Sequence, residues 1–191
     1  MTQAPTKLMV GMTAPNFQSV DLFDQPINLE DYRGRWLLLS FYRNAACALC
    51  NLRIHELIAK YPEYKHKGVN MLAIFESPRA NLLQYVGKQD APFPIVGDPE
   101  AHLYARYGIE ISEEKVKATM AATEGQQRMK EAAAAGFELT KEAGSNFYRI
   151  PADFLIDPDG IIREAFYSEL VGEHLDLAVV DAHLKAHTAT V

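Results

Sequence analysis

The sequence predicts an α/β fold with a central mixed sheet flanked by helices, and three observations support this prediction. Two nearly continuous apolar runs, at residues 36–42 and 69–75, have the composition of strands buried on both faces. Between them apolar residues recur at helical spacing, so that strand, helix and strand form a parallel unit with a right-handed crossover. Near the end of the chain, two further apolar runs flank residues 157–160 (DPDG), a strong signal for an antiparallel hairpin.

The other elements are predicted from apolar spacing and from helix start and stop signals. The first helix is expected over residues 47–61, where Pro62 ends it. The elements after the second strand are a short helix opened by Pro78, a short strand at 93–96, a helix at 99–107 closed by Gly108, hairpin strands at 152–156 and 161–166, and a last helix at 172–185. A parallel half followed by an antiparallel hairpin and a final helix is the thioredoxin arrangement.

Residues 112–145 are not part of the thioredoxin arrangement. They are rich in Ala, Glu, Lys and Gln, so they are expected to form a helical insertion that Gly125 and Gly136 break into pieces. Two interpretations stay open: a surface insertion, or a lid or dimer surface beside the functional site. No repeat or low-complexity linker divides the chain, so residues 1–191 are predicted to form a single domain.

Composition and charge exclude several classes of function. The chain has 191 residues, 48% of them hydrophobic and 23% charged, as in an ordinary soluble globular protein. Its net charge of -6 argues against nucleic acid or an anionic membrane as the main partner, because both require a basic surface. No apolar run reaches the roughly 20 residues that span a bilayer. The first residues lack the apolar core of a secretory signal, so the expected location is the cytoplasm.

Cys47 and Cys50 are the only two cysteines, and they lie where a predicted strand meets a predicted helix. Unpaired backbone N–H groups and the positive end of the helix dipole stabilise a thiolate at that position. The spacing places the second sulfur one turn away, where it can form an internal disulfide with the first. Two alternatives are a pair of buried structural cysteines and a zinc site, but zinc needs four ligands and no second pair is present. We therefore predict thiol redox chemistry.

Several motifs resemble one known family. They are GMTAPNF at residues 11–17, the cysteine segment, PFP at 92–94 with GDP at 97–99, and PADFLIDPDG at 151–160. In this order they resemble the alkyl hydroperoxide reductase/thiol-specific antioxidant superfamily. Within it the chain is most similar to a bacterial peroxiredoxin-like group whose FYR-x-x-x-C-x-x-C-N signature falls on Phe41, Tyr42, Arg43, Cys47, Cys50 and Asn51.

The resemblance implies a thioredoxin-like fold and a peroxidase-like, antioxidant thiol oxidoreductase with no cofactor beyond its own cysteines. It implies a peroxide or disulfide substrate, a reductant such as thioredoxin or glutathione, and a homodimer. It also implies that the Ile150–Pro151 bond is a cis-proline facing the cysteines. Without the resemblance, Pro151 is a proline at the start of a strand. A non-catalytic redox sensor or binding module with the same fold is the alternative function.

The site departs from the peroxiredoxin pattern, Pro-x-x-x-Thr-x-x-Cys with a later arginine. Cys50 falls on the peroxidatic cysteine, while Cys47 takes the threonine position, Arg43 the proline position and Pro151 the arginine position. Arg43 and Arg149 are candidates to replace the missing arginine. By analogy with thioredoxins the attacking thiolate is Cys47, and by analogy with peroxiredoxins it is Cys50. We favour Cys47.

Overall fold

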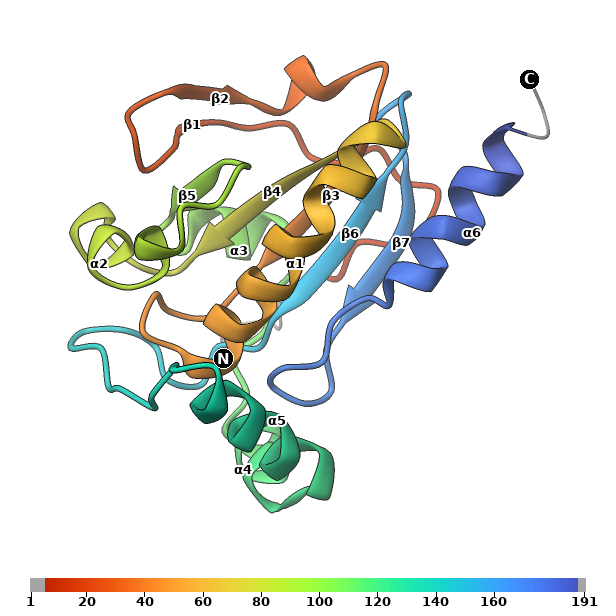
Figure 1. Cartoon of the computed structure of the whole chain (residues 1–191). Coiled ribbons are helices and arrows are strands. Elements are labelled where there is room, and N and C mark those ends of the chain that lie inside the picture. The colour runs from red at the N-terminus through yellow and green to blue at the C-terminus, as the bar shows by residue number, and fades with distance from the viewer. Residues whose placement is uncertain (1–5, 189–191) are drawn as a thin grey trace.

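The computed structural model describes residues 6–188 and is shown in Figure 1. Its strands are β1 (Gln18–Val20), β2 (Pro26–Asn28), β3 (Trp36–Phe41), β4 (Val69–Phe75), β5 (Ile95–Gly97), β6 (Ala152–Ile156) and β7 (Ile162–Tyr167). Its helices are α1 (Ala48–His66), α2 (Arg79–Gln84), α3 (His102–Arg106), α4 (Glu113–Ala121), α5 (Thr123–Ala134) and α6 (Leu177–Thr188), with short 3-10 helices η1 (Leu29–Tyr32) and η2 (Val86–Gln89).

The main sheet of the described chain has five strands in the order β5-β4-β3-β6-β7. β3 pairs with β4 in parallel, β4 pairs with β5 in parallel, and β6 is antiparallel to both β3 and β7. The predicted parallel unit and antiparallel hairpin are therefore confirmed, and so is the fold class. β3 lies at the centre of the sheet, and α1 starts from its carboxyl end.

Each face of the sheet is covered by a different layer. Leu38 of β3 belongs to the apolar cluster under α1, whereas Leu37 and Leu39 belong to the cluster on the opposite face. This alternation follows from the two-residue period of a strand. In Figure 1, α1 crosses in front of the sheet and α3 lies behind it. Both faces are buried, which explains why β3 and β4 read as continuous apolar runs.

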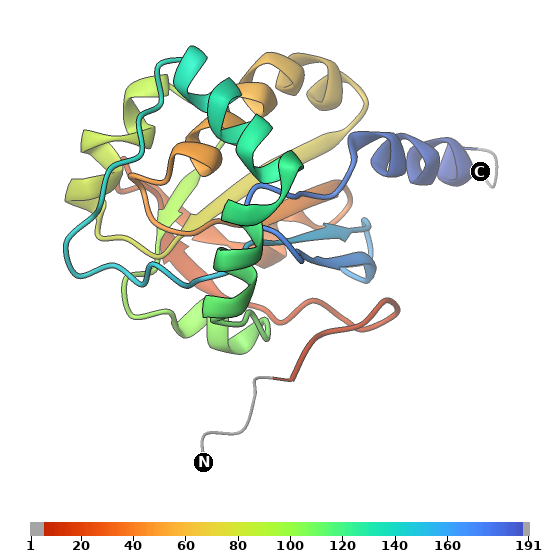
Figure 2. The same ribbon diagram turned by 90° about the horizontal axis from the view of Figure 1, so that it is seen from below.

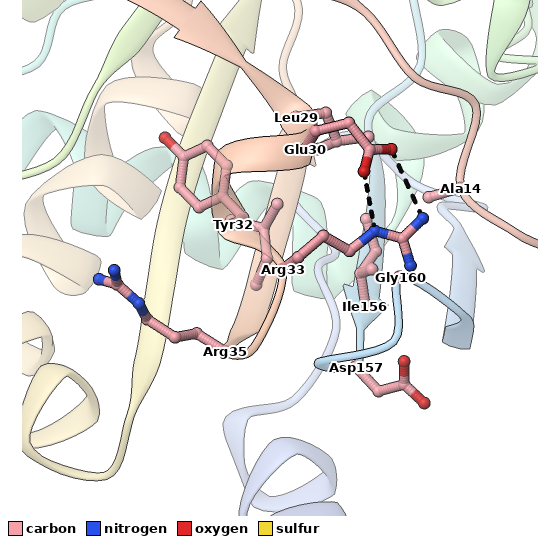
Figure 3. Close-up of a pocket in the computed structure, with 10 residues that line it drawn as sticks. Ala14, Leu29, Glu30, Tyr32, Arg33, Arg35, Ile156, Asp157 and Gly160 are labelled. Carbon is pink, nitrogen blue, oxygen red and sulfur yellow. Dashed lines mark hydrogen bonds and ion pairs between the residues drawn. The ribbon is translucent and has the colours of Figure 1, made fainter.

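The hairpin turn at residues 157–160 is closed by its own aspartate. Asp157 Oδ1 accepts hydrogen bonds from the N–H groups of Asp159 and Ile161, so this carboxylate has a structural role in the turn. Gly160 has a φ of 74°, and the Arg33 guanidinium lies where its side chain would be. Figure 3 shows Arg33 held there by an ion pair with Glu30, in a hollow at the opposite end of the sheet from the cysteines.

Several predicted boundaries are wrong. α1 does not end at Pro62 but continues to His66, because the buried Leu57 and Tyr64 on either side keep the helix on the core. α3 begins only at His102, since the Asp98 carboxylate accepts the N–H groups of His102 and Leu103 and so sets the first turn.

The two ends of the chain also differ from the prediction. α6 begins at Leu177 rather than near residue 172, because the N–H of Leu175 bonds to the Asp153 carboxylate instead of starting a helix. The two-stranded sheet of β1 and β2 was not predicted, since strands of three residues carry almost no periodic signal.

The insertion forms two consecutive helices at the carboxyl end of β3. Figure 2, seen from below, shows α4 and α5 in front of that end of the sheet. Gly136, with a φ of 86°, follows the end of α5 as predicted. Gly125 does not break the insertion; it lies inside α5, and a side chain there would come within 1.9 Å of the Thr119 carbonyl oxygen. The helices separate at Ala122, whose backbone is extended.

The prediction of a cis-proline is wrong, because no cis peptide bond occurs within residues 6–188 and the Ile150–Pro151 bond is trans. The intrinsically favoured trans form fits the pairing at this point. The N–H of Ile150 donates to the backbone carbonyl oxygen of Glu110, and the carbonyl oxygen of Pro151 accepts from the backbone N–H of Ser168 just before β6 begins. Pro151 is a buried residue at the start of a strand.

Candidate active site

Cys47 and Cys50 lie together at the junction of β3 and α1, as predicted. Cys47 is the N-cap of α1, and its Sγ accepts a hydrogen bond from the backbone N–H of Cys50 at 3.3 Å. Both thiols are free and buried, with 5% of Cys47 and 1% of Cys50 exposed. The N-cap geometry directs the first N–H groups of the helix at the Cys47 sulfur, which favours its anionic form.

Arg43 points at Cys47. Its Nη1 lies 4.0 Å from the Cys47 Sγ, at the outer limit of a hydrogen bond to sulfur. Its Nη2 donates to the carbonyl oxygen of Phe147, and its guanidinium carbon lies 4.7 Å from the centre of the Phe147 ring. Phe147, which sequence reasoning did not single out, thus fixes the orientation of the arginine.

The two thiols have opposite acidities. Burial raises the pKa of Cys47, but the hydrogen bond from Cys50, the charge of Arg43 and the N–H groups of Cys50 and Leu49 together lower it to about 6. Burial raises the pKa of the Cys50 thiol well above its usual value, and its contact with the Cys47 sulfur adds to this effect. At neutral pH, Cys47 is therefore the thiolate and Cys50 the protonated thiol.

A buried polar network holds the loop that precedes Cys47. The N–H of Ala45 donates to Ser77 Oγ at 2.8 Å, and the N–H of Ala46 donates to Glu142 Oε2 at 3.3 Å. On the other side, the Asn51 amide donates to the carbonyl oxygens of Ala45 and Cys47. Ser77 and Glu142 lie 32 and 96 positions from their partners, so no local pattern in the sequence identifies them.

The other two candidates from the sequence, Arg149 and Pro151, bond to residues other than the cysteines. Arg149 forms an ion pair with Glu76 at 2.6 Å and donates to the Ile109 carbonyl oxygen, so its guanidinium is occupied there. Pro151 is held through its carbonyl oxygen by Ser168 at the start of β6. Of the five candidate residues, Arg43, Cys47 and Cys50 are brought together by direct contacts.

A small hollow of about 20 Å³, room for roughly one water molecule, lies over Cys47 and Arg43. Its walls are mainly apolar and come from the insertion and the segment after it, including Met120, Met129, Leu139 and Phe147. Met120 and Leu139 are also among the exposed apolar residues, at 53% and 57%. Within residues 6–188, no cluster of three or more His, Cys, Asp or Glu side chains is placed to hold a metal ion.

Two curated relatives are similar over part of the chain. The thiol-disulfide oxidoreductase ResA of Bacillus thuringiensis subsp. konkukian is 30% identical over 104 residues, which is 54% of this chain and 60% of that protein. ResA of Geobacillus thermodenitrificans is 32% identical over 105 residues, again 54% of this chain and 60% of the relative. The chain therefore spans less than two thirds of the length of these relatives.

Solved structures resemble the fold over most of its length. The peroxidoxin BcpB of Mycobacterium tuberculosis has a TM-score of 0.64 at 16% identity and covers 94% of this chain and 96% of its own. A putative thiol:disulfide interchange protein DsbE from Chlorobium tepidum has a TM-score of 0.63 at 17% identity, over 94% of this chain and 98% of its own. At these identities the likeness shows a thioredoxin-like fold.

Among the described helices, none combines the length and the apolar character that a membrane span requires. The family model described as AhpC/TSA matches residues 10–165, a range that runs from the N-terminal region to β7 and includes both cysteines. The resemblance expected from the motifs is thereby confirmed: this chain belongs to the AhpC/TSA family.

Proposed function

We propose that this protein is a thiol-dependent oxidoreductase in which Cys47 attacks the substrate and Cys50 resolves the product. The observation that carries the proposal is the asymmetry of the pair: Cys47 is the N-cap thiolate beside Arg43, and Cys50 is a buried protonated thiol one turn away. A thiolate is the nucleophile in thiol redox chemistry, and a neighbouring thiol completes the cycle.

With a peroxide, the Cys47 thiolate attacks one peroxide oxygen. The O–O bond breaks, Cys47 becomes a sulfenic acid, and the leaving oxygen takes a proton to give water or an alcohol. Cys50 then attacks the Cys47 sulfur, so that a disulfide forms and water leaves with the Cys50 proton. An external dithiol supplies two electrons and two protons and restores both thiols.

Peroxide is the substrate that the site geometry favours. Cys47 is 5% exposed beneath the apolar cover, so a small molecule reaches it more easily than a bulky disulfide does. Within the described chain, the buried Nε of Arg43 has no hydrogen-bond partner. This N–H is a free donor near the attacking sulfur, where it can hold a peroxide oxygen in the manner of an oxyanion donor.

Disulfide exchange is the second candidate. It is supported by the Cys-x-x-Cys spacing and by the similarity to thiol-disulfide oxidoreductases over about half of the chain. In that reaction the Cys47 thiolate attacks one sulfur of the substrate disulfide and releases the other as a thiol. Cys50 then displaces the substrate from the mixed disulfide.

The test compares reduced wild type, Cys47→Ser and Cys50→Ser after one equivalent of hydrogen peroxide, with products read by mass spectrometry. We expect a rapid internal disulfide in wild type, a sulfenic acid trapped on Cys47 in Cys50→Ser, and no rapid oxidation in Cys47→Ser. A sulfenic acid on Cys50 in Cys47→Ser would reverse the assigned roles. Slow oxidation of all three, with rapid mixed-disulfide formation from a disulfide peptide, would select disulfide exchange.

We further propose the cytoplasm as the compartment and thioredoxin or glutathione as the reductant. A pair that must be re-reduced in each cycle requires a compartment that supplies thiol reductants. Steady-state peroxide consumption with either reductant supports an enzyme, whereas a disulfide that forms once and does not turn over indicates a redox sensor.

A further inference from the structure

The segment after α5 has an unusual pattern of burial. Of residues 135–148, all of which are described, only Glu142 is buried, with 5% of its surface exposed. Leu139, three positions earlier, is 57% exposed. An ordinary surface segment is anchored by an apolar side chain and leaves its carboxylates in water. Here the apolar Phe137 is only partly buried against the core, whereas the fully buried side chain is a carboxylate.

Glu142 is held by neutral donors that converge on its two oxygens. Oε1 accepts from the Ser77 hydroxyl at 2.7 Å and from the Asn81 amide at 2.7 Å. Oε2 accepts from the backbone N–H of Ala46 at 3.3 Å. Desolvating a carboxylate is costly, and neutral donors compensate for that cost less well than a cation does. A leucine in this place would anchor the segment at lower cost, so the carboxylate has another role.

The groups that bond to Glu142 are adjacent to the attacking cysteine or bond to residues beside it. Ala46 precedes Cys47, and Ser77, which donates to Glu142, accepts the N–H of Ala45. The carboxylate therefore fixes both N–H groups of the Ala45–Ala46 turn, one directly and one through the Ser77 hydroxyl. The same segment also holds Arg43, through the Phe147 carbonyl oxygen.

We propose that Glu142 is a positioning residue for Cys47. It fixes the Ala45–Ala46 turn so that the Cys47 sulfur stays within reach of Arg43 and of the first N–H groups of α1. Glu142 acts through this turn and does not touch the substrate. The inference deepens the proposed function, on which it rests, because it identifies a residue 95 positions after Cys47 that holds the attacking thiol in place.

Charge and position predict opposite effects when Glu142 is changed. A negative charge near Cys47 disfavours the thiolate, so removing that charge alone lowers the Cys47 pKa. If Glu142 positions the turn, its loss moves the Cys47 sulfur away from Arg43 and from the N–H groups of α1, and the Cys47 pKa rises. In Glu142→Gln at least one of the three donors meets an amide NH2 group instead of an oxygen. The direction of the shift therefore identifies the role.

The experiment measures alkylation of Cys47 by iodoacetamide from pH 4 to 10 in the reduced full-length chain, with each cysteine quantified by mass spectrometry. We expect Glu142→Gln to move the midpoint upward by about one pH unit, with roughly tenfold slower alkylation below pH 6. Glu138→Gln is the matched control, since it removes an exposed carboxylate from the same segment and should leave the midpoint unchanged. An unchanged or lowered midpoint in a folded Glu142→Gln would overturn the proposal.

A second variant keeps the test decisive where Glu142→Gln does not fold. Ser77→Ala removes the bridge between Glu142 and Ala45 and leaves the carboxylate in place. Positioning predicts an upward shift of the Cys47 midpoint in this variant as well, and an unchanged midpoint contradicts it. Because alkylation uses neither peroxide nor a disulfide, its outcome is independent of turnover. A protein without redox turnover can still show the shift, which separates the failure of this inference from the failure of the proposed function.

Discussion

Replacing Arg43 by methionine keeps an unbranched apolar stem in this buried position and removes the charge. The Nη1 to Sγ distance of 4.0 Å gives an attraction of about 4 kcal/mol at an effective dielectric constant of about 20, equivalent to about three pH units. Arg43 also donates to Phe147, and the distance to sulfur is long, so we expect the Cys47 pKa to rise by about two pH units from its value of about 6.

The thiolate of Cys47 forms as the pH rises through its pKa, so this change is visible near neutrality. At pH 7 the thiolate fraction falls from about nine tenths to about one tenth, and alkylation slows roughly tenfold. The assay is the pH profile of iodoacetamide alkylation at Cys47. Arg43→Lys keeps a charge and should fall between the two, while Arg35→Met removes an exposed arginine at the other end of β3 and should match wild type. An Arg43→Met profile that overlays wild type would refute the role of the arginine.

Two further predictions concern stability. His174→Ala removes the ion-pair partner that lies 2.9 Å from the buried Asp153 carboxylate and leaves the Leu175 N–H bonded to it, so we expect a loss of about 3 kcal/mol in the free energy of unfolding by urea at pH 7. Burial raises the Asp153 pKa, but the charge and hydrogen bond of His174 outweigh this and lower it in the folded protein. The stabilisation from the pair is therefore present above the unfolded-state pKa of Asp153 and is lost as the pH falls through its folded-state pKa. If the difference in unfolding free energy between wild type and His174→Ala does not shrink in acid, this explanation is contradicted. Gly125→Ala forces a methyl group against the Thr119 carbonyl oxygen and should lower stability by about 2 kcal/mol in thermal denaturation, whereas Ala134→Gly, in an exposed position of the same helix, should lower it by only about 1 kcal/mol.

The sheet and the cysteine pair were predictable because their signals are local. β3 and β4 are continuous apolar runs, and the DPDG turn specifies the hairpin of β6 and β7. The position of Cys47 at a helix N-terminus follows from the same reasoning. The end of α1 was missed because the packing of Leu57 and Tyr64 outweighs the local effect of Pro62.

The surroundings of Cys47 were not predictable from a single sequence. Glu142 and Phe147 are ordinary residues in a segment without periodicity, and only the folded chain brings them to the site. The sequence left the direction of Arg43 open, since a side chain one turn before a cysteine can point either way. The cis form of Pro151 was inferred from resemblance alone, and the pairing of Ile150 with Glu110 accommodates the trans form.

Residues 137–148, which form part of the cover over Cys47, and strand β3 beneath them are expected to differ in local stability. β3 is paired on both sides, so its amides are expected to exchange with solvent deuterium only when the domain unfolds as a whole. Residues 137–148 lie outside helices and strands, so we expect them to open at a lower free energy than β3 does. Access of a substrate to the Cys47 sulfur is therefore expected to depend on local opening of residues 137–148. Substitutions in the core can lower the melting temperature without changing how often the site is reached.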